Sequence, residues 1–328
     1  MDTMKSDLKP SFPTCSLCNK KSEKVVFGNI LQVNKRYSVY ECSSCKVWIT
    51  HPIPSLKELS ILYSTGNYRS KTGKRFNPVL EKIIHSLTIR KRNRINNYIS
   101  SGRILDIGCG RGLFLNIMRS DGWSVMGYEF DEKSASHAIN NYGIDVHTGV
   151  MDNQFEDESF DVVNVNHVLE HLKNPEQTLE NCHRILKKNG LLVIAVPNID
   201  SFQAKFGKDK WFQLDIPCHL YHFSSKSLNN LIEKKNFHIQ ATRHFKFEYN
   251  PFGWLQTILN VSGVRENHFY DLLKSSELRK TRSGILSLTE YLKLIFLIPL
   301  SIPVSVILSL IEAAYKKGGT IEVYAIKK

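Results

Sequence analysis

The sequence predicts an α/β protein built on a parallel sheet, preceded by a small cysteine-bearing segment and interrupted near its end by a helical insertion. Three observations lead to this prediction. From Arg103 onward, short apolar strands alternate with helical patterns, as in a three-layer fold around a parallel sheet. Two CxxC pairs stand near the N-terminus, and residues 294–311 carry no formal charge.

Length and composition bound the function classes. The 328 residues, 42% hydrophobic and 23% charged, suit one large or two smaller globular domains and exclude a disordered chain or a polytopic membrane protein. The net charge of +13 is concentrated in the first 100 residues, which hold 18 basic and 6 acidic residues. Such a region suits phosphate, nucleic acid or anionic lipid, and equally a solvated charged face. The first 13 residues lack the apolar run of a secretory signal, so we expect a cytoplasmic protein.

The N-terminal cysteines form two knuckles, Cys15-Ser-Leu-Cys18 and Cys42-Ser-Ser-Cys45, with 23 residues between them. Two adjacent knuckles can place four thiolates around one zinc ion, which replaces the core that so short a segment cannot build. The spacing predicts a zinc ribbon with a structural ion, because no coordination position stays open for catalysis. Redox pairs or unpaired thiols are the alternative. The remaining cysteines, Cys109, Cys182 and Cys218, are expected to be small apolar fillers.

The segments that follow are read from their periodicity. Apolar residues recur at helical spacing between Asn77 and Ile99, beside the basic run 90–94, and predict an amphipathic helix that leads into the sheet domain. The strands of that domain are then expected at Ile104–Ile107, Val125–Tyr128, Phe160–Val165 and Gly190–Val196.

A glycine-rich turn ends the first of these strands. It reads Asp106-Ile-Gly108-Cys-Gly110-Arg-Gly112 and opens a helix, an arrangement that brings backbone close to a ligand. The spacing is GxGxG, and the carboxylate of Asp106 would repel a pyrophosphate but attract an ammonium-bearing ligand such as S-adenosylmethionine (SAM). A second acid, Glu129, ends the next strand, where it can accept hydrogen bonds from both hydroxyls of a ribose.

From Arg103 to about Pro197 the chain resembles class I SAM-dependent methyltransferases. The resemblance is carried by the turn above, by Glu129, and by the stretches 159–163, 166–172 and 184–198. It implies a seven-stranded sheet with an antiparallel last strand and assigns SAM-binding roles along the chain. Asp106, Gly108 and Gly110 would bound the methionine end, Glu129 would hold the ribose, Phe130 would flank the adenine, and Asn166 and His167 would close over the donor.

The ribbon and the stretch 211–224 narrow the resemblance to zinc-ribbon methyltransferases of nucleotide-sugar and surface-glycan biosynthesis. We expect a ribbon at 1–60, a basic linker and helix at 61–100, the SAM-binding core at 101–249, a helical hydrophobic insertion at 250–318 and the final strand at 319–328. The expected activity is methyl transfer to a hydroxyl or carbon of a sugar nucleotide or lipid-linked glycan precursor. A quinone or other lipid O-methyltransferase is the first alternative.

Candidate catalytic residues lie at the strand ends where α/β sheets bind ligands. A sugar hydroxyl needs a base in the transition state, and a histidine with a near-neutral pKa suits that role. The candidates are His219, Tyr221 and His171; the alternative for each is that it only packs or shapes the pocket.

Two readings from other classes compete with this one. His167-Val-Leu-Glu170-His171 also fits the HxxEH motif of metalloproteases, although it directly follows an apolar strand. The basic N-terminal region could instead serve an RNA-binding protein or RNA methyltransferase, but no RNA module is recognisable and the hydrophobic insertion has no use there. We therefore expect no nucleic-acid partner.

The uncharged segment Leu294–Ile311 is short for a spanning helix and contains Pro299 and Pro303. Two readings remain open. The segment is either an interfacial element that places the enzyme peripherally at the inner membrane face, or a helical hairpin, bent at the prolines, that packs on the sheet or in a homodimer. The cations that would favour a membrane are Arg279, Lys280, Arg282, Lys316 and Lys317.

Overall fold

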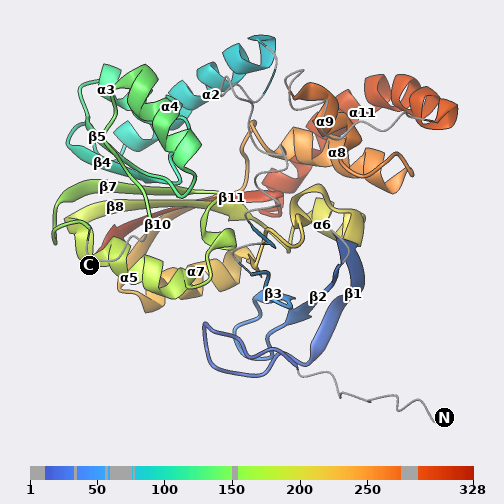
Figure 1. Cartoon of the computed structure of the whole chain (residues 1–328), viewed down its shortest axis with the longest axis horizontal. Coiled ribbons are helices and arrows are strands. Elements are labelled where there is room, and N and C mark those ends of the chain that lie inside the picture. Colours follow the sequence, from blue (N-terminus) through green and yellow to red (C-terminus); the bar gives the residue numbers. More distant parts are fainter. Residues whose placement is uncertain are drawn as a thin grey trace.

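The computed structural model describes residues 12–32, 35–55, 58–59, 76, 78–149, 154–274 and 287–328. In these residues the strands form a seven-stranded sheet, which is the centre of the molecule, and a separate four-stranded sheet (Figure 1).

The large sheet has the strand order β10–β11–β8–β7–β4–β5–β6. β11 alone is antiparallel to its neighbours, β8 and β10, and the remaining pairs are parallel. This confirms the predicted methyltransferase-type sheet with its antiparallel last strand. The strands are β4 (Arg103–Ile107), β5 (Ser124–Tyr128), β6 (Val146–His147), β7 (Phe160–Asn166), β8 (Leu186–Pro197), β10 (Phe237–Arg243) and β11 (Thr320–Lys327).

Helices cover both faces of this sheet (Figure 1). On one face lie α2 (Pro78–Asn96), α3 (Leu113–Ser120) and α4 (Glu132–Tyr142), and on the other α5 (Pro175–Ile185) and α7 (Ser225–Lys234). The central strands β4, β7 and the second half of β8 are largely buried and mostly apolar, as two-sided burial requires. The helix expected at 77–99 is α2.

The N-terminal sheet is not independent of the core. Its strands β1 (Lys24–Gln32), β2 (Lys35–Glu41) and β3 (Trp48–His51) form an antiparallel meander. β3 then pairs with β9 (Tyr221–His222), a strand from the loop that carries two of the catalytic candidates. The ribbon therefore holds the loop after β8 by backbone hydrogen bonds, a link that the sequence did not indicate.

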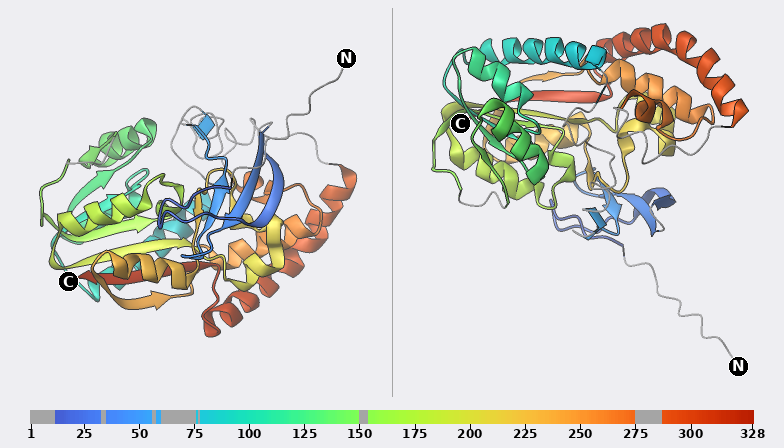
Figure 2. Two further views of the ribbon diagram at one scale, coloured as in Figure 1. Left: turned by 90° about the horizontal axis from the view of Figure 1, so that it is seen from below. Right: turned by 45° about the horizontal axis from the view of Figure 1, so that its top comes forward.

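The insertion between β10 and β11 is helical, as expected, and contains α8 (Asn250–Val261), α9 (His268–Leu273) and α11 (Leu288–Ala314). The expectation of a hairpin bent at the prolines is wrong, because Pro299 and Pro303 lie inside one continuous 27-residue helix. α11 packs along α8 and reaches the outer edge of the molecule (Figure 2). By length and composition it is the one helix in the described residues that could cross a membrane.

An ordinary surface helix buries its apolar side chains and exposes its polar ones, and α11 does the reverse. Its buried residues are mostly small or polar: Leu294, Ser301, Ser305, Ser309 and Glu312. Large apolar side chains stand exposed on the same helix, among them Phe296, Leu300, Ile302, Val304, Ile307 and Leu310. The side chains of Arg279, Lys280 and Arg282 lie outside the described residues, whereas Lys316 is exposed after the helix.

Candidate functional site

The glycine-rich turn lies at the carboxyl end of β4. Gly108, Gly110 and Gly112 have φ values of +74°, +57° and +79°, a region that disfavours side chains. A Cβ on Gly108 would stand 2.3 Å from Cγ2 of Val168, so this turn packs directly against the loop that follows β7. The backbone is thus shaped to approach a ligand at the start of α3.

Asp106 lies at the base of this turn and is 5% exposed. Asn164 on β7 donates a hydrogen bond to its carboxylate. Burial raises the pKa of Asp106 to about 6, although the charge of Lys91 and the Asn164 bond oppose the rise. A carboxylate that is this poorly solvated gains from a positively charged ligand, as the methionine end of SAM would be.

Glu129 directly follows β5, beside the turn, and is 7% exposed. Its Oε2 accepts a hydrogen bond from Gly110 N at 2.7 Å and its Oε1 one from Asp131 N at 3.0 Å. These bonds fix the carboxylate at the rim of the glycine turn, where ribose hydroxyls would reach it. Phe130 is 53% exposed and makes an edge contact with Tyr128, which leaves its ring accessible to an adenine. These residues fit SAM.

Asn166 and His167 follow at the end of β7, the strand next to β4. Asn166 donates to Tyr249 Oη at 3.3 Å and accepts a 3.0 Å bond from Lys246 Nζ. The His167 ring lies 4.2 Å from the ring of Tyr249, centroid to centroid, and its Nδ1 is 3.3 Å from Glu170 Oε1. Both predicted donor-side residues therefore stand at the same edge of the sheet as Asp106.

His171 and His219 come together with Glu170, which the sequence considered only as a protease base. The possible ligand atoms of these three side chains all lie within 4.8 Å of one another. His219 is 6% exposed, and burial together with the neighbouring charge of His171 lowers its pKa to about 4. His219 is therefore neutral at physiological pH, although a base of so low a pKa is weaker than the one that the sequence predicted.

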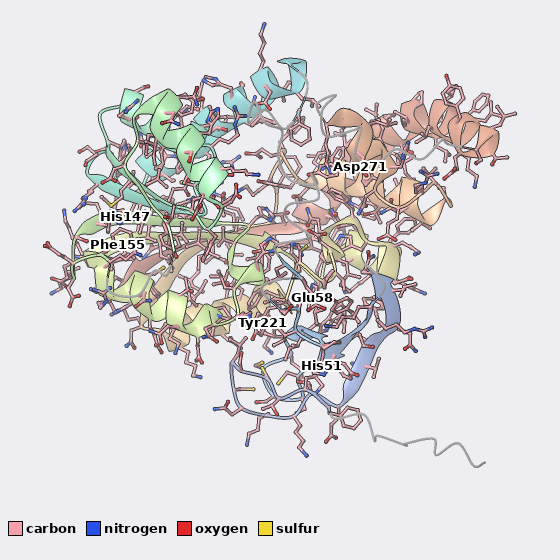
Figure 3. The ribbon with its side chains drawn as sticks, viewed as in Figure 1. His51, Glu58, His147, Phe155, Tyr221 and Asp271 are labelled. Atoms are coloured by element: carbon pink, nitrogen blue, oxygen red, sulfur yellow. The ribbon has the colours of Figure 1, made fainter. Side chains whose placement is uncertain are left out.

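The side chains of Tyr221 and His222 contact the N-terminal ribbon. The Tyr221 hydroxyl pairs with Ser16 of the first knuckle and donates to Lys173 O at 3.2 Å, and Figure 3 shows Tyr221 beside the ribbon. His222 Nε2 lies 3.0 Å from Thr50 Oγ1 on β3. The geometry separates Tyr221 from the His171–His219 pair and gives it a packing role between ribbon and core, because its hydroxyl is committed to these partners.

The four ribbon cysteines converge as predicted. Their sulfur atoms lie within 4.8 Å of one another, with Cys15–Cys45 at 3.6 Å and Cys18–Cys42 at 3.4 Å. Tetrahedral zinc with bonds of about 2.3 Å needs sulfur atoms about 3.8 Å apart, so the cluster fits the ion closely. Cys109, Cys182 and Cys218 are buried, as expected.

Residues 80–242 match the family model described as a methyltransferase domain. This part of the chain is a class I SAM-dependent methyltransferase domain. It carries the Asp106 turn, Glu129 and the loop with Glu170, His171 and His219.

The chain is similar to several known proteins. A probable S-adenosylmethionine-dependent methyltransferase of Mycolicibacterium smegmatis is 28% identical over 141 residues, 42% of this chain and 53% of that protein. The ubiquinone biosynthesis O-methyltransferase of Maricaulis maris is 40% identical over 103 residues, 29% of this chain and 41% of that protein. The chain thus spans about half the length of such curated relatives. A solved SAM-dependent methyltransferase from Archaeoglobus fulgidus is 20% identical, covers 81% of this chain and 99% of its own, and has a TM-score of 0.48.

The domain also shows why the HxxEH reading is disfavoured. The residues Leu169–His171 form a single 3₁₀ turn, and His167 has a φ of +53°. A protease helix would put His167 and His171 on one ion with Glu170 as the base. Here Glu170 itself groups with His171 and His219 instead.

Some supporting residues of the domain gave no signal in the sequence. Lys91 of α2 is buried over the ring of Phe114, 4.2 Å from its centroid, instead of lying on a solvated basic face. Lys246, 1% exposed, pairs with Glu322 at 2.6 Å and so positions Asn166. An isolated lysine has no spacing to reveal it, because its role depends on residues that are distant in the chain.

Proposed function

We propose that the protein transfers the methyl group of SAM to a hydroxyl or carbon of a sugar that is carried on a nucleotide or a lipid. The observation behind the proposal is the pairing of two buried carboxylates, Asp106 and Glu129, with the glycine turn at one edge of the sheet. Binding would place the donor beside the histidines of the adjacent loop. Catalysis would come mainly from holding the acceptor and the methyl carbon in line at near-attack distance.

A basic hollow supports an acceptor that carries phosphate. It has a volume of about 440 Å³ and lies between the ribbon and α6 (Phe202–Gly207). Phe27 and Trp48 line it together with four lysines, and two of these, Lys46 and Lys205, are paired with acidic neighbours. Lys208 and Lys226 make none of the ion pairs found in the described part of the chain. Trp48 pairs with His222 across β3 and β9, so one wall of the hollow is joined to the strand that follows His219.

Mass spectrometry of sugar nucleotides and lipid-linked glycans tests the acceptor class. Cells with and without the protein are compared, together with purified protein supplied with isotopically methyl-labelled SAM. The proposal expects one or more precursors to lose the mass of a methyl group in the deficient cells and to gain the label in vitro. Identical profiles and no labelled sugar would contradict it.

A quinone-type or other lipid acceptor is the second candidate. It is favoured by the similarity to ubiquinone biosynthesis O-methyltransferases, including a second one from Haemophilus ducreyi that is 32% identical over 132 residues, 36% of this chain and 56% of that protein. Label in a quinone fraction instead of the glycan fraction would select this candidate.

We further propose that the protein is cytoplasmic and that α11 docks it on the inner face of the membrane, where a lipid-linked acceptor is delivered. The support is the reversed burial of this helix: serines and Glu312 face α8 and α6, while leucine, isoleucine and phenylalanine face outward. Exposing these apolar side chains to water is unfavourable, whereas they insert readily at a lipid interface. The exposed Lys316 follows the helix and suits anionic headgroups, whereas the next residue, Lys317, is paired with Asp200.

Flotation on anionic vesicles tests this docking. Full-length protein should float at low salt and partly detach at high salt, and Phe296→Glu/Leu300→Glu should stay in the soluble fraction. Val261→Glu, an exposed apolar position on α8, is the matched control. Wild-type protein that does not float and sediments as a dimer would assign the outer face of α11 to a second copy.

A further inference from the structure

Glu170, His171 and His219 come from two separate loops. The first two form the turn after β7, and His219 lies in the segment just before β9. Backbone contacts hold the loops together, with Leu220 N donating to Glu170 O at 2.8 Å and Thr50 Oγ1 donating to His219 O at 2.7 Å. The convergence is therefore built into the fold, and the three possible ligand atoms lie within 4.8 Å of one another.

Both imidazole rings are oriented by backbone carbonyls. His219 Nδ1 lies 3.0 Å from Gln213 O, and His171 Nδ1 lies 3.0 Å from Cys218 O. A carbonyl only accepts hydrogen bonds, so each Nδ1 carries the hydrogen, and Nε2 of the neutral ring carries the lone pair. Histidines that bind metals are commonly fixed in this way, with one nitrogen on a carbonyl and the other directed at the ion.

The carboxylate of Glu170 supplies the second, independent observation. The side chain is 1% exposed; its Oε1 is paired with the His167 ring, and its Oε2 accepts no hydrogen bond from the described residues. Its nearest neighbours are His167 Nδ1 at 3.3 Å and His219 Nε2 at 4.0 Å, both from Oε1. Burying a carboxylate in this way is costly unless a cation compensates it, so the arrangement points to a ligand of positive charge.

We propose that Glu170, His171 and His219 bind one divalent cation of the zinc or manganese class. Two imidazoles and one carboxylate suit such ions, and three protein ligands leave a coordination position for a small oxygen ligand. Bonds of about 2.1 Å would put the ligand atoms about 3.4 Å apart in a tetrahedral site. The 4.0 Å between Glu170 Oε1 and His219 Nε2 is longer than that value, so a bound ion would have to draw these side chains closer together.

The role of this ion rests on the proposed methyl transfer. An acceptor hydroxyl in the open position would lose its proton to water more readily, because the cation stabilises the alkoxide. The alkoxide oxygen then forms the new O–CH₃ bond while the S–CH₃ bond of SAM breaks, and that electron pair stays on sulfur in S-adenosylhomocysteine. Asp215, whose Oδ2 is 3.9 Å from His219 Nε2, stands half exposed beside the site and could orient the acceptor.

Electron paramagnetic resonance of Mn²⁺ with the full-length protein tests the site, because Mn²⁺ prefers oxygen and nitrogen ligands and the four thiolates of the ribbon suit it poorly. Wild-type protein should take up one Mn²⁺ per chain, displaceable by Zn²⁺, and Glu170→Gln should bind it at least tenfold more weakly. Asp145→Asn is the matched control: Asp145 also stands 4.0 Å from a histidine, His147, but on the surface and without a third ligand.

Calorimetry with SAM on the same samples separates the possible failures. Glu170→Gln that still binds SAM is folded, so its loss of Mn²⁺ reports on the site; His219→Ala serves if Glu170→Gln does not fold. Wild-type protein that binds SAM but takes up neither Mn²⁺ nor any zinc beyond the ribbon ion overturns this inference alone. Protein that binds metal but neither binds SAM nor transfers methyl would leave the site standing and refute the proposed function.

Discussion

The described residues contain two metal-capable clusters, which differ in construction. The ribbon cluster consists of four thiolates from two short motifs, fills every tetrahedral position and is visible in the sequence. The Glu170–His171–His219 cluster has three mixed ligands, and the fold has to bring two loops together to make it. The comparison indicates that a closed, local ligand set stabilises structure, whereas an open set assembled at the edge of a sheet serves chemistry.

The largest expected effect is on the ribbon. Cys42→Ser removes one of four thiolates, and because metal binding supplies roughly 10 kcal/mol or more to such small folds, β1 to β3 should unfold. Hydrogen exchange should show lost protection in the ribbon while β4, β7 and β8 remain protected, and elemental analysis should show the loss of one zinc. Unchanged protection in β1 to β3, or wild-type protein that lacks zinc when purified without chelators, would contradict a structural ion.

Next in size is the effect on the open cluster. His219→Ala should lower turnover by about 100-fold or more, the usual range for losing a group that assists proton transfer, while SAM affinity is retained. His147, which is half-buried and distant from the cluster in sequence, provides the control as His147→Ala. Partial rescue by saturating Mn²⁺ would show that a ligand was lost, whereas a shifted pH profile without rescue would favour a base. Unchanged turnover would contradict the prediction and would mean that His219 only packs in the loop.

A third effect concerns the donor site and its pH dependence. The pKa of Asp106 is raised to about 6 in the ligand-free protein, chiefly by burial. The ammonium group of SAM would bind the ionised carboxylate of Asp106. Below pH 6 the carboxyl group must lose its proton before SAM binds, so the affinity of the protein for SAM should fall about tenfold for each further pH unit. Calorimetry between pH 5 and pH 8 measures this. Asp106→Asn should bind weakly at every pH, and a flat wild-type profile would argue against the role.

The smallest expected effect lies at the link between the two clusters. Thr50→Val keeps the shape of the side chain but removes the hydroxyl that donates to His219 O, at a cost of about 1 kcal/mol. Turnover should fall a few-fold because the loop with His219 loosens. Thr88→Val, which loses a similar 2.7 Å bond to Ile84 O on α2, should change stability but not turnover. Equal effects on turnover would mean that the ribbon does not position the loop.

Prediction of the fold from sequence succeeded where signals are local. The strand–helix alternation and the glycine turn each occupy a few consecutive residues, and the structure confirms the sheet that they imply. The two CxxC knuckles converge into the expected cluster, whereas the SAM-binding roles of Asp106 and Glu129 stay predictions. The pairing of β3 with β9 was not predicted, because each strand is short and the two strands are far apart in the chain. Glu170 was read with its sequence neighbours instead of with His219 for the same reason.

The insertion is helical as predicted, but the hairpin reading of it failed, for a different reason. Proline usually breaks a helix, so Pro299 and Pro303 suggested a bend. In α11 the helix continues through both positions, and its apolar surface surrounds a narrow buried stripe of serines. Composition alone revealed that the segment is apolar, but only packing against α8 showed which side is covered.

The most direct test of the account is calorimetric titration of the full-length protein with SAM and with S-adenosylhomocysteine. We predict one binding site per chain for both ligands, at least 100-fold weaker binding for Asp106→Ala, and unchanged binding for Asp121→Ala, a partly exposed carboxylate after α3 that pairs with Arg92. Wild-type protein with no measurable affinity for either ligand would contradict the assignment of the glycine turn, Asp106 and Glu129 as a methyl-donor site.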